Sequence, residues 1–189
     1  MILSKLSQRI KPLISGGIAI ALLFVTIAQP ISAHALTSNP APQAKVSFTF
    51  DDGLNSAYSV AAPTLAKYGF TGTNYVTTDC IGMTTIPNTC RATNDAQYMS
   101  WAQVEALRST YGWEIGSHTV THPYLATSDA SDGQPNVLTP AQVTYELTHS
   151  KEVLAQHGFD AQSFAAPYGD YDTNTLAEIA KYYSSNRGF

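Results

Sequence analysis

The sequence has little charge, few cysteines and no cluster of basic side chains. Charged residues occupy only 13% of the 189 positions, and the formal net charge is −4. Loss of residues 1–35 would remove three cations and no anions, which leaves seven Lys and Arg against fourteen Asp and Glu, a net charge of −7. An acidic chain without a basic patch is not expected to bind nucleic acid or an anionic membrane surface.

The N-terminal segment has the pattern of a signal peptide. Three cations within residues 5–11 precede an almost wholly apolar run, 13–31, and Ala33-His34-Ala35 fits a small-residue cleavage site. We expect cleavage near Ala35–Leu36 and a secreted, periplasmic or cell-surface protein without a stable membrane partner. The alternative is an uncleaved membrane anchor, since the run nearly reaches spanning length, but two glycines and a proline interrupt it.

Only two cysteines are present, Cys80 and Cys90, and no histidine lies near them in the sequence. A metal site built on thiolates is therefore not expected. Outside the cytoplasm, two cysteines in one loop favour a disulfide. We predict that Cys80 and Cys90 are linked and hold the intervening Thr-, Pro- and Asn-rich segment against the domain.

Predicted strands and helices alternate after a proline-containing linker, 36–44. The strands are expected at 46–50, 71–78, 113–116, 164–166 and from 183, and the helices at 56–68, 100–111, 139–158 and 172–182. Alternation of this kind favours parallel strands joined by helical crossovers, which is an α/β fold. Residues 45–189 suffice for one domain with a core of its own.

An acidic pair ends the first predicted strand. Apolar and polar residues alternate from Val46 to Phe50, and Asp51-Asp52-Gly53 follows at once. A solvated turn is one interpretation, since Asp-Gly is a common turn pair. The other is a functional site, in which a metal ion on one carboxylate and a proton-transfer role for its neighbour make two adjacent negative charges tolerable.

Two histidines follow the third predicted strand at a spacing of four residues. One helical turn or a tight loop would direct His118 and His122 to the same ion, and Pro123 disfavours a longer helix there. Two hydrogen-bonded structural histidines are the alternative. If they are ligands, His118 and His122 would form with Asp52 a two-histidine, one-carboxylate set, which suits zinc hydrolases and non-haem iron enzymes alike. The additional carboxylate of Asp51 favours a hydrolase, which needs a general base.

Three short segments resemble successive motifs of the polysaccharide deacetylase family, the NodB-homology group or carbohydrate esterase family 4. They are Thr49-Phe50-Asp51-Asp52-Gly53, Ser117-His118-Thr119-Val120-Thr121-His122, and Pro167-Tyr168-Gly169. The first two are highly specific together, and the third is weaker. The resemblance extends from about residue 45 to the end of the chain and implies a distorted, seven-stranded (β/α) barrel.

The resemblance also implies roles for individual residues. Asp51 looks like the general base, and the backbone N–H of Tyr168 looks like a donor to the oxyanion, with Pro167 and Tyr168 at the substrate. The ligands of a divalent metal, usually Zn²⁺ and sometimes Co²⁺ or Ni²⁺, would be Asp52, His118 and His122. The implied reaction hydrolyses N-acetyl or O-acetyl groups of a cell-wall or extracellular polysaccharide and releases acetate.

The chain departs from the family pattern at two places. Many members have an arginine two residues before the proline of the third motif, which orients the base, and here that position is Ala165. The Asp-x-x-Asp-Trp and Leu-x-His motifs are not found after Tyr168, and Leu147-Thr148-His149 lies inside a predicted helix. We therefore expect a barrel without its last strands. A catalytically impaired carbohydrate-binding protein and a small-amide hydrolase of the same superfamily are the alternatives.

Overall fold

The computed structural model describes residues 44–83, 90, 97–128 and 137–188. The predicted signal peptide, 1–35, and all but the last residue of the predicted linker lie outside these ranges. None of the helices in the described part of the chain is both long and apolar enough to cross a membrane.

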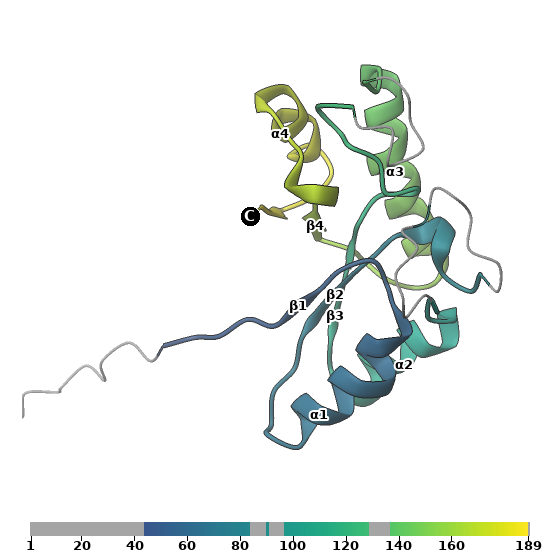
Figure 1. The fold of residues 1–189 in the computed structure, drawn as a ribbon, viewed down its shortest axis with the longest axis vertical. Coiled ribbons are helices and arrows are strands. Elements are labelled where there is room, and N and C mark those ends of the chain that lie inside the picture. The colour runs from purple at the N-terminus through teal and green to yellow at the C-terminus, as the bar shows by residue number, and fades with distance from the viewer. Residues whose placement is uncertain (1–43, 84–89, 91–96, 129–136, 189) are drawn as a thin grey trace, which may run out of the picture. The chain divides into compact units, whose positions relative to one another are not determined.

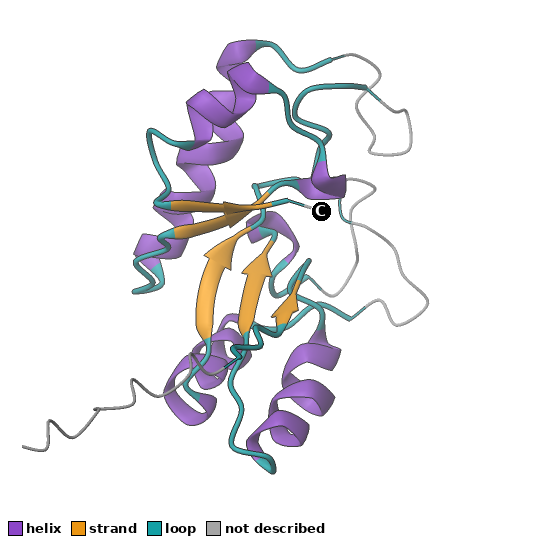
Figure 2. Ribbon diagram, turned by 90° about the vertical axis from the view of Figure 1, so that its left-hand side faces the viewer, coloured by secondary structure: helices purple, strands orange, loops and turns teal. Residues whose placement is uncertain are grey.

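Five parallel strands form one sheet in the described ranges, in the consecutive order β1-β2-β3-β4-β5. They are β1 (Thr49–Phe50), β2 (Thr73–Val76), β3 (Glu114–Ser117), β4 (Ser163–Ala165) and β5 (Ser185–Arg187). Figure 2 shows that β4 and β5 turn across the direction of the first three strands, so the sheet is curled. A consecutive parallel order with this curl matches part of a distorted (β/α) barrel, as predicted, rather than a doubly wound sheet.

A helix crosses over between each pair of consecutive strands. A π-helical stretch, Ala57–Ala61, continues into α1 (Ala62–Ala66), and α2 (Trp101–Tyr111), α3 (Pro140–Gln156) and α4 (Thr173–Ile179) follow. Short 3₁₀ turns cover Thr78–Cys80 and Pro167–Gly169. In Figure 1, α1 and α2 lie at one end of the molecule, and α3 and α4 lie at the other, on the side of β4.

The predicted first residue of a helix agrees with the structure where a side chain caps the backbone N–H groups, and differs where no such cap forms. Ser100 and Thr139 each form a capping box with the glutamine three residues later, so α2 and α3 begin where expected. Ser56, the first residue of the helix expected at 56–68, does not cap it. Its φ of −60° and ψ of −27° are helical, and its side chain makes no capping hydrogen bond. The helical backbone already begins at Asn55.

The core lies between the sheet and its helices. Its fully buried side chains come from strands and helices alike and include Val76, Val104, Leu107, Leu147, Leu154 and Phe164. On α3 the buried positions Val143, Leu147 and Leu154 recur at helical spacing, which gives that helix one apolar face. Burial of this face packs α3 against β3.

The predicted disulfide is present. Cys80 and Cys90 are bonded, with their Cα atoms 5.7 Å apart, and both pack with Tyr98 and Leu54 in a small second core. Leu54 pairs with Tyr98 in an isolated bridge directly after the acidic pair. The cross-link therefore steadies the segment that leaves the end of β1.

Candidate metal centre

The acidic pair lies directly after β1 in a conformation that separates its two side chains. Asp52 has a φ of 70° and Gly53 a φ of 83°, so two successive residues are left-handed. The positive φ favours glycine at position 53, and a Cβ there would also lie 2.5 Å from Ile81 Cδ1. This turn sends Asp52 toward the histidines, whereas Asp51 contacts Arg187.

The histidines lie on a tight loop after β3, as predicted. Thr119 and His122 both have positive φ, 70° and 62°, which no helical turn would allow. The hydroxyl of Thr119 accepts a hydrogen bond from His122 N at 2.9 Å and closes the loop. We refer to residues 117–122 as the ligand loop.

A buried glutamate on α3 holds the middle of the ligand loop. One carboxylate oxygen of Glu146 accepts hydrogen bonds from Val120 N at 2.8 Å and Thr121 N at 3.0 Å. The other oxygen accepts from the Thr121 hydroxyl at 2.7 Å. Burial raises the pKa of Glu146 above its usual value, although these hydrogen bonds act in the opposite direction. Glu146 lies outside the three sequence motifs that predicted the site.

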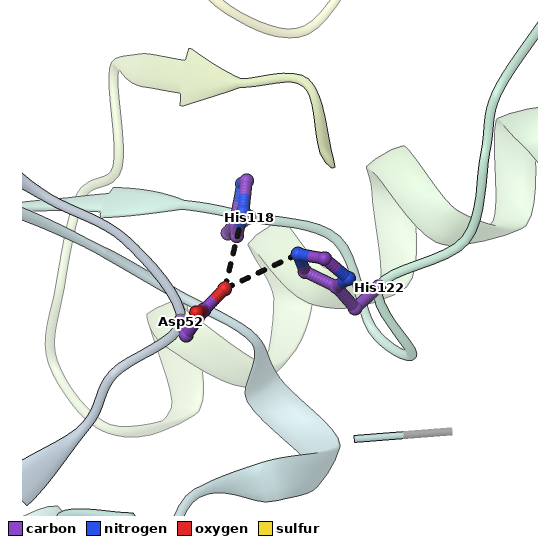
Figure 3. A group of neighbouring side chains, drawn as sticks. All are labelled: Asp52, His118 and His122. Carbon is purple, nitrogen blue, oxygen red and sulfur yellow. Dashed lines mark ion pairs between the residues drawn. The ribbon is translucent and has the colours of Figure 1, made fainter. Parts of the chain in front are cut away.

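Three side chains converge on one point (Figure 3). His122 Nε2 lies 3.2 Å from Asp52 Oδ1, and His118 Nε2 lies 3.5 Å from the same oxygen. All three potential ligand atoms lie within 4.8 Å of one another. Both histidines are buried, whereas the Asp52 side chain keeps 13% of its surface exposed. The structure thus brings together the three residues that the motifs predicted as ligands.

His118 is prepared to act as a ligand through Nε2. Its Nδ1 lies 2.7 Å from the carbonyl oxygen of Ala165, so Nδ1 carries the proton and donates it. That tautomer leaves the Nε2 lone pair directed at the convergence point, an arrangement typical of metal-ligating histidines. Burial first, and then the neighbouring charge of His122, lower the pKa of His118 to about 3, so the ring is neutral at pH 7.

The convergence point has the size and chemistry of a zinc site. Tetrahedral ligands at roughly 2.0–2.1 Å from zinc lie about 3.3 Å from one another. The separations of 3.2 Å and 3.5 Å between Asp52 Oδ1 and the two histidines are close to this value. Two neutral imidazoles and one carboxylate also form the donor set of catalytic zinc sites, in which a fourth position stays open. The residues present therefore fit a divalent metal ion.

Comparison with known proteins agrees with this geometry. A family model described as polysaccharide deacetylase matches residues 38–184. The chain belongs to the polysaccharide deacetylase family. This deacetylase-family chain is also 29% identical over 161 residues to YxkH of Bacillus subtilis (strain 168), itself provisionally named a polysaccharide deacetylase. That alignment covers 84% of this chain and 49% of YxkH, so the chain spans about half the length of its curated relative.

Solved structures of deacetylases share the fold. The deacetylase PplD of Streptococcus pyogenes, determined with acetate, is 29% identical with a TM-score of 0.59, over 78% of this chain and 57% of PplD. The deacetylase domain of BpsB from Bordetella bronchiseptica has a TM-score of 0.61 at 21% identity, over 75% of this chain and 62% of that chain. The second likeness shows the fold alone.

In this member of the deacetylase family, Asp51 has a partner that lies outside the sequence motifs. Arg187 Nη2 donates to Asp51 Oδ2 at 2.5 Å. Asp51 Oδ1 is buried and accepts no hydrogen bond from the described residues. Burial raises the pKa of Asp51, whereas Arg187 acts to lower it. The only signal in the sequence was a cation on a predicted strand, and its contact with Asp51 spans 136 residues.

The third deacetylase motif forms the 3₁₀ turn after β4. Its Tyr168 has a φ of 58°, and its ring lies 4.7 Å from the ring of His122. Tyr124 stacks on Tyr168 with ring centroids 3.9 Å apart, and Pro167 is buried. The turn therefore lies beside the ligand loop. His149, by contrast, is on α3, paired with Glu152 at 3.4 Å and stacked on Tyr145, which agrees with its exclusion from the site.

Proposed function

We propose that this chain is the metal-binding part of an exported hydrolase that removes N-acetyl or O-acetyl groups from a polysaccharide and releases acetate. The observation that carries the proposal is the convergence of Asp52, His118 and His122 beside a separately held Asp51. Membership of the polysaccharide deacetylase family supports the substrate class. The predicted leader, 1–35, supports export, with an N-acetylated cell-wall or extracellular polysaccharide as the partner.

Asp52, His118 and His122 would hold the metal ion, for which Zn²⁺ is the first candidate and Co²⁺ and Ni²⁺ are alternatives. Such an ion supplies Lewis-acid polarisation of the acetyl carbonyl and makes water a stronger acid. The Nδ1–H bond from His118 to the Ala165 carbonyl fixes the ring so that Nε2 points inward. The hydrogen bond from His122 N to the Thr119 hydroxyl fixes the backbone of His122.

Asp51 would act as the general base. Its Oδ1 takes a proton from the attacking water while Oδ2 stays bonded to Arg187. The water oxygen bonds to the acetyl carbon, the bond from that carbon to nitrogen or oxygen breaks, and the proton that Asp51 has taken up passes to the leaving atom. The backbone N–H of Tyr168 would donate to the developing oxyanion, and Pro167 and the Tyr168 ring would face the sugar.

The test is acetate release from chitooligosaccharides by the full chain with Zn²⁺ or Co²⁺ supplied. Asp51→Asn should keep stoichiometric metal and lose turnover by roughly 10²–10⁴-fold, the range for a general base. Asp52→Ala should lose the metal and the activity together. Asp160→Asn is the matched control, because Asp160 is exposed and bonds only to the neighbouring Gln162 side chain among the described contacts.

Two results would contradict the proposal. Undiminished acetate release by Asp51→Asn with metal bound would remove Asp51 from the role of base. Binding of chitooligosaccharides by a folded, metal-loaded chain that never releases acetate would favour the carbohydrate-binding alternative instead.

A further inference from the structure

The ion pair between Arg187 and Asp51 joins the two outer strands of the described sheet. Arg187 is the last residue of β5, and Asp51 directly follows β1. The two side chains are 23% and 28% exposed, so the pair is mostly shielded from water. A guanidinium that far along the chain reaches the base because the curl of the sheet brings its two edges toward each other (Figure 2).

The position of Arg187 in the sheet accounts for its direction. It pairs in register with Ala165 of β4, and paired residues of parallel strands project to the same face. Ala165 is fully buried and has no side chain beyond Cβ, while its carbonyl accepts from His118. Arg187 therefore supplies a long cationic side chain at the level of the sheet where β4 supplies only a methyl group.

Neighbouring groups limit the movement of the guanidinium. Its central carbon lies 5.7 Å from the centroid of the Tyr75 ring. That ring is in turn packed over Gly116, where an added Cβ would come within 2.6 Å of it. After Arg187 the backbone is confined as well, because a Cβ on Gly188 would lie 2.2 Å from the Tyr171 hydroxyl. Arg187 is thus held by its surroundings rather than extended into solvent.

We infer that Arg187 is the positioning residue of Asp51: it binds Oδ2 and so fixes the plane of the carboxylate, which presents Oδ1 for proton transfer. The inference rests on the proposed function, in which Asp51 is the base. A carboxylate beside a second carboxylate would otherwise turn away from it, because like charges repel. The guanidinium offsets that repulsion through its ion pair with Oδ2, and it acts on the reaction through Asp51.

The experiment compares Arg187→Met, Arg187→Lys and Arg108→Met in the full chain with saturating Zn²⁺ or Co²⁺. Arg187→Met should lower kcat about 10²-fold, the cost of a misplaced catalytic group, and change KM by less than about threefold. Arg187→Lys should recover part of the loss, since it restores the charge without the guanidinium geometry. Arg108 is the matched control, because it also pairs with a carboxylate at 2.5 Å and lies over an aromatic ring, but on α2.

A double-mutant cycle distinguishes positioning from general stability. In an Asp51→Asn background, Arg187→Met should change the residual kcat by less than about twofold, because the group through which it acts is gone. Urea unfolding of the same four metal-free proteins should show a coupling of about two- to fivefold in the unfolding equilibrium constant. Metal stoichiometry should be equal in all four.

Each outcome decides between defined alternatives. Full kcat in Arg187→Met alongside an active wild type, or absence of coupling in the unfolding cycle, would overturn the inference and leave the proposed function intact. A metal-loaded wild type that releases no acetate would overturn the proposed function, and the unfolding cycle would still decide whether Arg187 holds Asp51.

Discussion

The ligand loop and the base Asp51 draw their support from very different distances along the chain. Thr119 closes the ligand loop from within, and Glu146 binds it from 25 and 26 residues away. Asp51 is held from a distance of 136 residues, by the last described strand. The ligand loop is therefore held from within, from α3 and, at His118, from β4, whereas the base is held from β5. Metal binding and catalytic competence can accordingly be separated by mutation.

Substitution of Glu146 should have the largest effect, because Glu146 accepts three hydrogen bonds from the ligand loop. Glu146→Ala leaves the N–H groups of Val120 and Thr121 without their acceptor, and each buried orphan costs about 1–3 kcal/mol. We expect a loss of about 2–4 kcal/mol in unfolding free energy and a metal affinity about 10–100-fold weaker. Urea unfolding and metal titration measure the two effects.

The control for that variant is Glu105→Ala, which removes an exposed carboxylate paired with Arg108. Its cost should stay below about 1 kcal/mol, as for other surface ion pairs, with unchanged metal affinity. Equal metal affinity in Glu146→Ala and wild type would show that the ligand loop keeps its shape without the Glu146 carboxylate.

Removal of the metal should give the next largest loss of stability, and the loss should fall on the ligand loop and not on β5. At a free concentration of about 100 times Kd, a metal that binds only the native state adds about 2.7 kcal/mol of stability, which a chelator takes away. We expect amide exchange to slow on metal addition at 118–122 and much less at 185–187. In the Asp52→Ala protein, metal addition should slow amide exchange in neither segment. Equal protection of 118–122 and 185–187 in the wild type would show that the ligand loop and β5 respond to the metal together.

The same contrast explains which features could be predicted from the sequence. Each of the two ligand motifs, the capping boxes of α2 and α3 and the disulfide consist of residues close in sequence, so local spacing predicts them. Glu146 carried a weaker signal, as a charge on the apolar face formed by Val143, Leu147 and Leu154. The partner of Asp51 could not be predicted, because it depends on the register that sets Arg187 beside Ala165.

The N-terminal cap of α3 offers a smaller change that separates stability from the site. The Thr139 hydroxyl accepts a hydrogen bond from Gln142 N at 3.3 Å, and Thr139 N donates one to Gln142 Oε1 at 2.9 Å. Thr139→Ala should cost about 1 kcal/mol, while Thr139→Ser keeps the cap. Metal affinity should stay within about twofold of wild type in both, because Glu146 lies two turns further along the helix. A tenfold loss of affinity would show that any weakening of α3 reaches the ligand loop.

The smallest expected effect is in the pH dependence of stability, and it isolates the charge of Glu146 from its hydrogen bonds. Glu146→Gln keeps an acceptor for both N–H groups and places an amide donor against the Thr121 hydroxyl. Because burial raises the pKa of Glu146 in the folded state, folding takes up a proton between the usual pKa, near 4.5, and the raised one. This contribution is fully present below the usual pKa and is lost as pH rises through the folded pKa.

The unfolding free energy of Glu146→Gln minus that of wild type should therefore increase with pH above about 4.5 and then level off. Taking the difference cancels the other titrating groups. Glu178→Gln provides a control of opposite sign, since the hydrogen bond from Lys181, followed by that from Thr144, lowers the pKa of Glu178. Its difference from wild type should decrease as pH rises toward the usual pKa. A flat profile for Glu146→Gln would mean that the carboxylate holding the ligand loop is charged at no net cost, and the loop would then owe its shape to Thr119 and β3.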